Sequence, residues 1–321
     1  MKVKVLSRLF NEVWPAKRPI SGFEFDYDQA CREYDWLVVF DEFGRDGVNF
    51  ETLACPRERT ILCTWEPVTI KGYSRAYTRQ FGHLLTNRPP SAERHPNYHL
   101  GRGYFIPFVH AIPPIGTIRK ERTLSAVCSA KQMKHTRHHE RYRLLTAVAR
   151  EVPDFDWFGK GVRPLAHKED ALLPYRYHLA VENHIGERFW TEKLPDAFLC
   201  ECLPFYAGDP LISEVFPRES YIPIPIDDPA EAVRIVRAAI ASDEYSRRRE
   251  AVLEAKRLVV EKYNFRRQVM DVIESCGDSP VAPSREPVRI YTRRALRWHD
   301  PVALLEDGWL HVCQAFGGLR R

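Results

Sequence analysis

Short apolar runs of strand length alternate along this chain with longer segments of helical periodicity, and this alternation constrains the fold more than any other feature. The run WLVVF at residues 36–40 is apolar throughout, as expected of a buried strand. Similar runs lie at residues 2–6, 60–65, 82–86, 104–109, 124–128, 155–158, 177–181, 203–206 and 221–224. Helical patterns cover residues 138–150, 190–200, 229–241, 243–262 and 265–275. Strands that alternate with helices predict an α/β fold with mostly parallel sheets.

A change of composition in the middle of the chain predicts two such α/β units. The segment HAIPPIGTIRKERT, residues 110–123, contains two prolines, a glycine and a charge run, which is typical of a linker. We therefore expect one domain at residues 1–118, a second at 119–275 and a C-terminal tail at 276–321. The helical pieces of the tail mix Trp, Leu and Arg. They either pack back on the protein or form a basic amphipathic contact with a membrane surface.

Composition limits the classes of protein to which the chain can belong. At 321 residues it can form two domains with proper cores. The net charge of +5 argues against a dedicated nucleic-acid binder and suits a protein that handles anionic nucleotides or works near an anionic membrane. The eight cysteines include no CxxC pair, so we expect reduced, mostly buried thiols. No run approaches the ~18 apolar residues of a membrane-spanning helix, and no signal peptide is evident.

The segment from residue 177 to residue 193 reads as a strand, a polar loop and the start of a helix. The strand ends in Glu182-Asn183, and Thr191-Glu192-Lys193 opens the helix. The first turn of a helix attracts anions, because its N–H groups lack internal partners and carry the positive end of the dipole. Lys193 adds a positive charge, and Glu192 can accept hydrogen bonds from hydroxyls, so the pattern indicates a nucleotide sugar. Asn183 is either a binding amide or a turn former.

Eight residues at fixed spacing carry a resemblance to a known family. They are Tyr177, Leu179, Glu182, Asn183, Thr191, Glu192, Lys193 and Leu194, in the pattern Y-x-L-x-x-E-N-x(7)-T-E-K-hydrophobic. Here the chain resembles the α1,3/4-fucosyltransferase family, and the resemblance extends over roughly residues 120–265. The family often has Tyr three residues before the Glu-Lys pair, where this chain has Phe189. The Phe189 ring can stack or pack in the donor site but cannot donate a hydrogen bond.

The resemblance implies a GT-B-like architecture, in which two Rossmann-like domains face a cleft. The first domain would bind a glycan acceptor and the second would bind GDP-fucose. It implies inverting transfer of fucose to a hydroxyl of a surface polysaccharide or lipopolysaccharide, with no nucleic-acid partner. Animal members of the family carry a membrane anchor, which this chain lacks, so we expect a bacterial cytoplasmic enzyme, and a peripheral contact with the inner membrane stays open. Two alternatives also stay open: another nucleotide sugar on the same fold, and a catalytically silent protein that binds a glycan or nucleotide.

Arg141 is the candidate phosphate ligand in the basic stretch that follows the run at residues 124–128. The resembling family has a phosphate-binding Arg here, followed by apolar residues at offsets of three, four and seven. Arg141 has Leu144, Leu145 and Val148 at these offsets, whereas Arg137 has charged residues at the first two. A guanidinium can bind phosphate oxygens through two donors at once. The alternative is a solvated basic face of the helix.

Glu66 is the candidate catalytic base. Inverting transfer needs a carboxylate that takes the proton of the acceptor hydroxyl as it attacks the anomeric carbon. Glu66 follows the run TILCTW and precedes a proline, which favours extended backbone. The resembling family has its proposed base at a Glu after a strand in this region. Asp41 and Glu42, which follow WLVVF, are the alternatives, and Glu66 could also be an ordinary carboxylate in a surface turn.

No pattern in the sequence predicts a metal site or another cofactor. Two D-x-D tripeptides, at residues 26–28 and 154–156, are short enough to arise by chance. The histidines at positions 135, 138 and 139 have no second ligand cluster at a suitable spacing. We therefore expect metal-independent transfer, with the leaving group stabilised by Arg141, Lys193 and a helix N-terminus.

Overall fold

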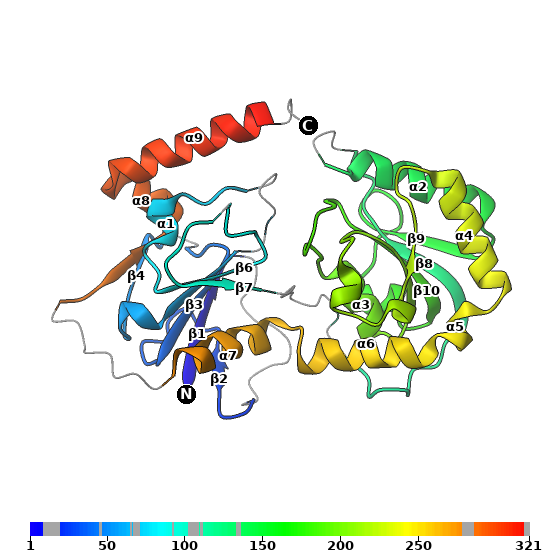
Figure 1. The fold of residues 1–321 in the computed structure, drawn as a ribbon, viewed down its shortest axis with the longest axis horizontal. Helices are drawn as coiled ribbons and strands as arrows, with labels where there is room; N and C mark the ends of the chain where they lie inside the picture. Colours follow the sequence, from blue (N-terminus) through cyan, green and yellow to red (C-terminus); the bar gives the residue numbers. More distant parts are fainter. Residues whose placement is uncertain are drawn as a thin grey trace. The chain divides into compact units, whose positions relative to one another are not determined.

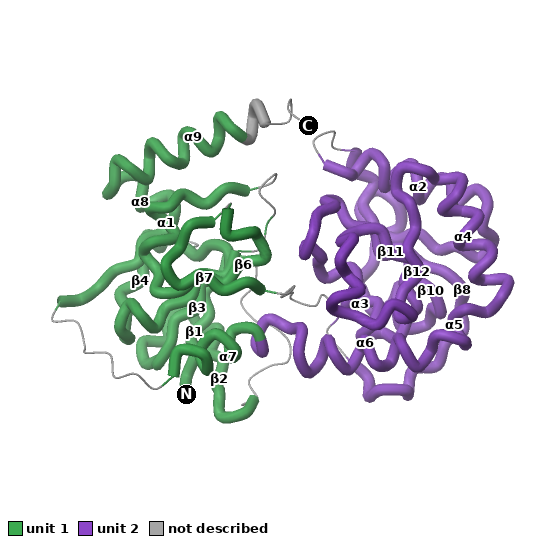
Figure 2. Tube along the Cα trace, in the orientation of Figure 1, with its two compact units in different colours: residues 1–101, 268–321 green, residues 102–267 purple. Residues whose placement is uncertain are grey.

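The computed structural model describes residues 1–8, 20–44, 47–64, 66, 71–91, 93–101, 109, 112–132, 136–277 and 286–317, with side chains up to residue 313. The chain divides into two units (Figure 2). Unit 1 comprises residues 1–101 and 268–321, and unit 2 comprises residues 102–267.

Over its described residues, unit 1 is built on a six-stranded sheet in which all neighbouring strands run parallel (Figure 1). In spatial order the strands are β2 (Glu24–Asp26), β1 (Lys2–Ser7), β3 (Trp36–Phe40), β5 (Thr60–Thr64), β6 (His83–Thr86) and β7 (Tyr98–Leu100). The central strands β3 and β5 are buried along their whole length, as their apolar runs require in a parallel sheet covered on both faces.

The C-terminal segment of the chain returns to unit 1 through the helix α7 (Phe265–Cys276). Unit 1 also contains β4 (Phe50–Thr52), the 3-10 helix η1 (Arg57–Arg59), α1 (Arg75–Thr78), β13 (Arg289–Tyr291), α8 (Arg293–His299) and α9 (Pro301–Gly317). β13 pairs antiparallel with β4, and α9 packs against α8 and α1 (Figure 1). The Ala76 backbone amide donates a hydrogen bond to the Glu306 carboxylate at 2.9 Å. The tail thus packs on the first sheet.

Five parallel strands form the sheet in the described part of unit 2. In spatial order they are β12 (Ile222–Pro223), β11 (Leu203–Ala207), β10 (Tyr175–Val181), β8 (Arg122–Val127) and β9 (Phe155–Phe158). The helices are α2 (His138–Glu151), α3 (Lys193–Leu199), α4 (Pro229–Ala241), α5 (Glu244–Arg247) and α6 (Arg249–Glu261), with 3-10 turns η2 (Lys168–Ala171), η3 (Ile212–Glu214) and η4 (Arg218–Ser220). Val181 pairs with Ala207, so the loops after β10 and β11 meet at the carboxyl edge.

The predicted α/β class with two Rossmann-like units is confirmed, since both large sheets are parallel and their strands alternate with helices. The strands at residues 36–40 and 155–158 and the helix at 229–241 have the predicted bounds. The sequence pattern does not indicate β2, β4, β7 or β13, because three residues are too few to show a period of two. The helix predicted at 243–262 divides into α5 and α6 at Arg248.

The two units differ from the expected domains at both boundaries. The first segment of unit 1 ends at residue 101, before the expected boundary at 118. Its second segment begins at residue 268, before the expected boundary at 275, and includes the tail expected at 276–321. Most of the strand predicted at 104–109 lies outside the described residues. Of the helices that the structure describes, none is both long enough and apolar enough to cross a membrane.

Candidate functional site

Glu182 is the first residue after β10 and lies fully buried at the carboxyl edge of the unit 2 sheet. Its backbone amide continues the sheet by donating to the carbonyl of Ala207. Its carboxylate accepts hydrogen bonds from the Thr191 backbone amide and hydroxyl, both at 2.8 Å, and pairs with the Lys193 ammonium at 3.1 Å. A buried carboxylate is costly without partners, so these bonds tie the end of the loop back to the strand.

Lys193 is shared between two carboxylates. Its ammonium lies 3.1 Å from Glu182, 3.2 Å from Glu192 and 2.7 Å from the Thr191 hydroxyl. Burial opposes the charged amine, but the two carboxylates outweigh burial and raise the pKa of Lys193. Burial also opposes the charge of Glu192, but Lys193 and Lys168 outweigh it and lower the pKa of Glu192 to about 2. Lys193 and Glu192 are therefore both charged at neutral pH.

The helix N-terminus contributes less to this site than the sequence pattern suggests. The helix predicted at residues 190–200 forms only over Lys193–Leu199, a length of seven residues. The backbone amide of Thr191 is already bonded to Glu182. The positive charge at this position therefore comes mainly from the side chain of Lys193.

Arg141 lies on α2, and its charge acts on Lys193. It is buried, and its guanidinium donates to the Cys128 sulfur at 2.7 Å. Its Nε has no hydrogen-bond partner among the described residues. Its charge acts on Lys193, where it opposes the effect of the carboxylates. The alternative, Arg137, is partly exposed and pairs with Asp227 at 2.6 Å. Arg141 is therefore the buried arginine beside Lys193.

Asn183 and Phe189 lie in the loop between β10 and α3. The carbonyl of Asn183 accepts a hydrogen bond from the backbone amide of Arg137 at 3.0 Å, which joins this loop to the start of α2. Phe189 is buried, and its ring meets that of His184 edge to face at 5.0 Å between centroids. The structure thus places Asn183 beside the α2 terminus and gives Phe189 a packing role within the loop.

The network contains two residues that the sequence reasoning did not assign to the site. Glu182 belongs to the motif, and a charged residue directly after a buried apolar strand is a signal that could have identified it. Lys168, in η2, acts on Glu192 and forms an ion pair with the buried Asp196 at 2.6 Å. No local sequence pattern could have identified Lys168, because it lies in η2, a segment separate from the motif.

A cavity of about 370 Å³ lies at the carboxyl ends of β11 and β12. Its lining includes Ile185, Tyr206, Asp209, Tyr221 and Asp227. Ile185 belongs to the same loop as Asn183, so the loop between β10 and α3 contributes to the lining of this cavity. Its volume lies in the range of small-molecule sites.

Glu66 lies at the carboxyl edge of the other sheet, in unit 1. It is half-buried in a bend after β5. Its carbonyl oxygen accepts two hydrogen bonds from the Arg88 guanidinium, at 2.6 and 3.1 Å. Glu66 therefore lies at the carboxyl edge of its sheet, where catalytic groups of parallel sheets gather, and its role as the base stays a prediction.

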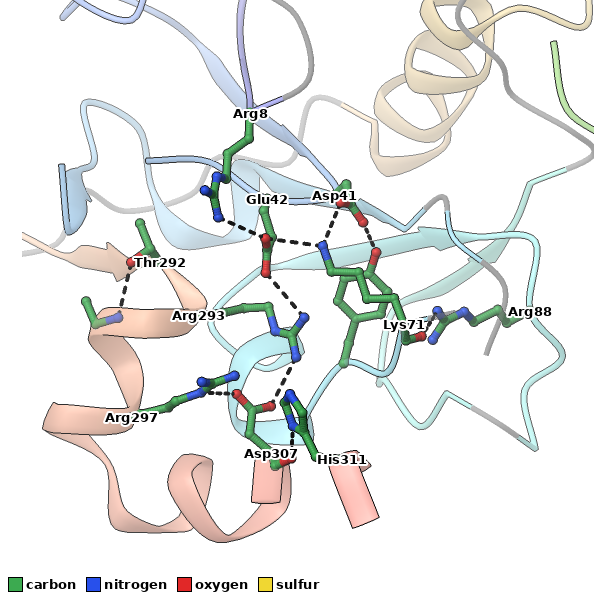
Figure 3. Close-up of polar contacts among 12 residues, drawn as sticks. Arg8, Asp41, Glu42, Lys71, Arg88, Thr292, Arg293, Arg297, Asp307 and His311 are labelled. Carbon is green, nitrogen blue, oxygen red and sulfur yellow. Dashed lines mark hydrogen bonds and ion pairs between the residues drawn. The ribbon is translucent and has the colours of Figure 1, made fainter. Parts of the chain in front are cut away.

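The alternative bases, Asp41 and Glu42, follow β3 at the same edge and take part in an ion-pair network (Figure 3). Asp41 is buried in the left-handed region, at φ 63°, and its carboxylate accepts from the Lys71 ammonium at 2.7 Å and from the Tyr73 hydroxyl. Glu42 lies 3.2 Å from both Lys71 and Arg293. Both carboxylates therefore tie β3 to other segments of unit 1.

Neither D-x-D tripeptide is arranged as a metal site. Asp26 pairs with Lys2 at 3.1 Å, and Asp156 pairs with Arg122 and Arg163 at 3.1 and 2.8 Å. Within the described ranges, no group of three or more His, Cys, Asp or Glu side chains is placed to hold a metal ion. All eight cysteines are free, and five of them are buried.

Comparisons with known proteins find similarity at the level of structure. No family model matches the chain, and no curated protein sequence matches it. A crystal structure of an α1,3-fucosyltransferase is 13% identical, covers 89% of this chain and 92% of its own, and has a TM-score of 0.45. An α1,3-fucosyltransferase with GDP-fucose is 12% identical over 94% and 90%, with a TM-score of 0.37. Sucrose-phosphate synthase from Thermosynechococcus elongatus is 10% identical over 76% and 73%, with a TM-score of 0.45. The fold assignment rests on the two sheet topologies themselves.

Proposed function

We propose that the protein is an inverting glycosyltransferase that moves fucose from GDP-fucose to a hydroxyl of a glycan acceptor. The observation that carries the proposal is the set of charges at the carboxyl edge of the unit 2 sheet. There Lys193 lies 3.1 Å from Glu182 and 3.2 Å from Glu192, and the charge of the buried Arg141 acts on Lys193. Open parallel sheets bind ligands at this edge. Two cations suit a diphosphate, and a neighbouring carboxylate suits the hydroxyls of a ribose.

In the donor site, Arg141 and Lys193 would stabilise the negative charge of the departing diphosphate. Arg141 is buried and has an unpartnered Nε donor, so a phosphate oxygen that reaches it would satisfy a donor that otherwise lacks a partner. Glu192 would accept hydrogen bonds from the ribose hydroxyls. Glu182 would keep Lys193 in place, because it is fully buried and also bonded to Thr191. Asn183 would contribute its amide, and Phe189 would support the loop by packing.

Glu66 would act as the general base in unit 1. As the acceptor oxygen attacks the anomeric carbon, its proton passes to the Glu66 carboxylate. The bond between that carbon and the diphosphate oxygen breaks, and GDP leaves with the electron pair. Attack from the face opposite the leaving group inverts the configuration. We expect no metal or other cofactor to be required, since Arg141 and Lys193 supply positive charge for the leaving group.

A thermal-shift screen tests the donor. The purified protein is heated with GDP-fucose, other GDP-sugars and UDP-, CDP- and ADP-sugars, because a bound ligand raises the midpoint. GDP-fucose should give the largest increase, and fucose transfer or donor hydrolysis should accompany it. A larger increase with a UDP-sugar would assign another donor to the same fold. Binding with neither hydrolysis nor transfer would identify a catalytically silent binding protein.

We further propose that the C-terminal helices hold the enzyme at the anionic surface of the inner membrane, where a lipopolysaccharide or surface-polysaccharide precursor would serve as acceptor. Trp298, Leu305 and Trp309 are 85%, 73% and 68% exposed, and Arg294 is exposed beside them. Apolar and basic side chains together favour an anionic lipid interface. The protein should float with phosphatidylglycerol vesicles, and the combined Trp298→Ser, Leu305→Ser and Trp309→Ser variant should not. Equal flotation of both proteins would contradict this contact.

A further inference from the structure

Arg88 is a buried cation that has no part in the transfer chemistry described above. It lies two residues after β6 and is 5% exposed. A buried guanidinium is costly unless hydrogen-bonding partners satisfy its donors. The hydrogen-bonding partners of Arg88 therefore indicate its role.

The Arg88 guanidinium joins two points of the segment that follows β5. Nε and Nη2 both donate to the carbonyl of Glu66, at 3.1 and 2.6 Å, and Nη2 also donates to the carbonyl of Lys71. Nη1 pairs with the buried carboxylate of Glu93 at 2.5 Å. One planar group thus spans two backbone positions five residues apart and has its charge balanced from the opposite side. Figure 3 shows it directed at Lys71.

The position of Arg88 is itself fixed by the neighbouring strands. Its backbone amide donates to the Thr86 hydroxyl at 3.2 Å, and its carbonyl accepts from the Tyr98 hydroxyl. Its guanidinium lies over the ring of Tyr73, 4.7 Å from the centroid. Thr86 is in turn bonded to Thr64 at the end of β5, at 2.6 Å. These contacts fix the position of the Arg88 guanidinium relative to the strands, and the guanidinium in turn fixes the backbone of Glu66.

We infer that Arg88 is a positioning residue, which sets where the general base lies by holding the carbonyls of Glu66 and Lys71 on one guanidinium. The inference rests on the proposed role of Glu66. The geometry requires a planar fork with several donors at fixed angles, which arginine has. A lysine carries the same charge at a single point and cannot reproduce both contacts. The Arg88→Lys variant thus separates position from charge.

The first test is the turnover of Arg88→Lys. Small displacements of a catalytic group cost large factors in rate, so kcat should fall by about 10- to 100-fold. KM for the donor should change little, because the donor is bound by residues of unit 2. The matched control is Arg57→Lys, in which an exposed arginine that donates to the carbonyl of Arg79 is replaced. This control should retain kcat within about two-fold, as surface substitutions usually do.

The decisive test is a double-mutant cycle between Arg88→Lys and Glu66→Gln. If Arg88 acts through Glu66, Arg88→Lys reduces turnover strongly in the wild-type background and little in the Glu66→Gln background. An equal loss in both backgrounds would mean that Arg88 only supports the fold, which overturns the inference. Wild-type turnover of Glu66→Gln would instead refute the proposed base, whatever Arg88→Lys does.

A second variant keeps the inference testable if Arg88→Lys fails to fold. Glu93→Gln leaves the guanidinium intact and removes its balancing charge. Its turnover should fall less than that of Arg88→Lys but should depend in the same way on an intact Glu66. A loss from Glu93→Gln that is equal with and without the Glu66 carboxylate would again overturn the positioning role.

Discussion

The carboxyl edges of the two sheets carry charged networks of different construction. In unit 2, the network around Lys193 comes largely from one strand-loop-helix segment, residues 182–193, with Arg141 added from α2. In unit 1, the network of Figure 3 joins side chains from residues 8, 41, 42, 71, 293, 297 and 307. The first network is local in sequence, and the second joins the two ends of the chain.

This difference indicates different roles for the two networks. Most charges around Lys193 are set by a single loop, so the fold of unit 2 does not depend on them to hold distant segments together. In unit 1, Arg293 links Glu42 to Asp307 at 3.2 and 3.4 Å and thereby attaches the C-terminal helices to β3. We therefore expect substitutions in the first network to change ligand binding as well as stability, and substitutions in the second to change stability alone.

The largest expected effect is on turnover, in Glu66→Gln. Gln keeps the shape of the side chain and removes the proton acceptor, so transfer should slow by about 10²–10⁴-fold. GDP affinity should hardly change, because the proposed GDP site lies in unit 2. Turnover and GDP affinity are measured on the same sample. Turnover within a few-fold of wild type would mean that another residue is the base, and Asp41 and Glu42 would be the next candidates.

Arg293→Met tests whether the charged network of unit 1 stabilises the fold. It leaves Glu42 and Asp307 in the network without the cation that joins them, and Asp307 is nearly fully buried. A buried charge that loses its sole partner destabilises a protein by about 3–5 kcal/mol, and the loss here should lie below this range, because Asp307 keeps Arg297 at 2.7 Å and Glu42 keeps Lys71 at 3.2 Å. Urea unfolding should show this loss, while GDP titration of the folded variant stays unchanged. A variant of wild-type stability would mean that the network does not hold the tail.

The pH dependence of the free energy of unfolding tests how much the Glu192 carboxylate stabilises unit 2. The pKa of Glu192 is lowered to about 2, so its contribution is present above the ordinary Glu value and is lost as the pH falls through about 2. At most about 3 kcal/mol is involved, from the size of the shift. The buried His178, whose pKa is lowered to about 3 by burial, also destabilises the fold in acid.

The difference between the wild type and Glu192→Gln isolates the Glu192 contribution, because both proteins retain His178. Between pH 5 and pH 2, Glu192→Gln should lose less free energy of unfolding than the wild type. Parallel curves for the two proteins would show that Glu192 gains nothing from Lys193 and Lys168.

Lys193→Ala should weaken GDP binding by about 1.5–3 kcal/mol, the range for a hydrogen bond to a charged group. Calorimetry with GDP measures this directly. The control is Lys256→Met, which breaks another buried ion pair of unit 2, with Glu201 at 2.8 Å, that includes none of the residues proposed to bind GDP. The control should lose stability and keep its GDP affinity. Unchanged GDP affinity in a folded Lys193→Ala protein would remove Lys193 from the donor site.

The smallest expected effect is that of chelation. Transfer should persist in EDTA, because the charge of the leaving group is balanced by side chains, although divalent ions could stimulate it modestly. The rate is compared before and after dialysis against EDTA. Complete loss of activity, restored by manganese, would contradict metal independence and return attention to the tripeptides at residues 26–28 and 154–156.

Much of the fold was predictable from local signals. Apolar runs of four or more residues located the central strands, whereas the three-residue strands β2, β4, β7 and β13 gave no periodic signal. The offsets of apolar residues after Arg141 favoured it over Arg137, and the structure buries Arg141 and leaves Arg137 partly exposed. Helix spacing carries this information, because it decides which side chains of α2 face the sheet.

The sequence by itself determined the α/β class and the motif of the proposed donor site, because both depend on contiguous residues that share one strand, loop or helix. Only the tertiary structure decided that Glu182 secures Lys193, that Lys168 acts on Glu192 and that the tail packs on unit 1. It alone brought Arg88 to the carbonyls of Glu66 and Lys71. Such contacts join side chains from separate segments, and their geometry is set by the register and packing of whole strands, which no local pattern records.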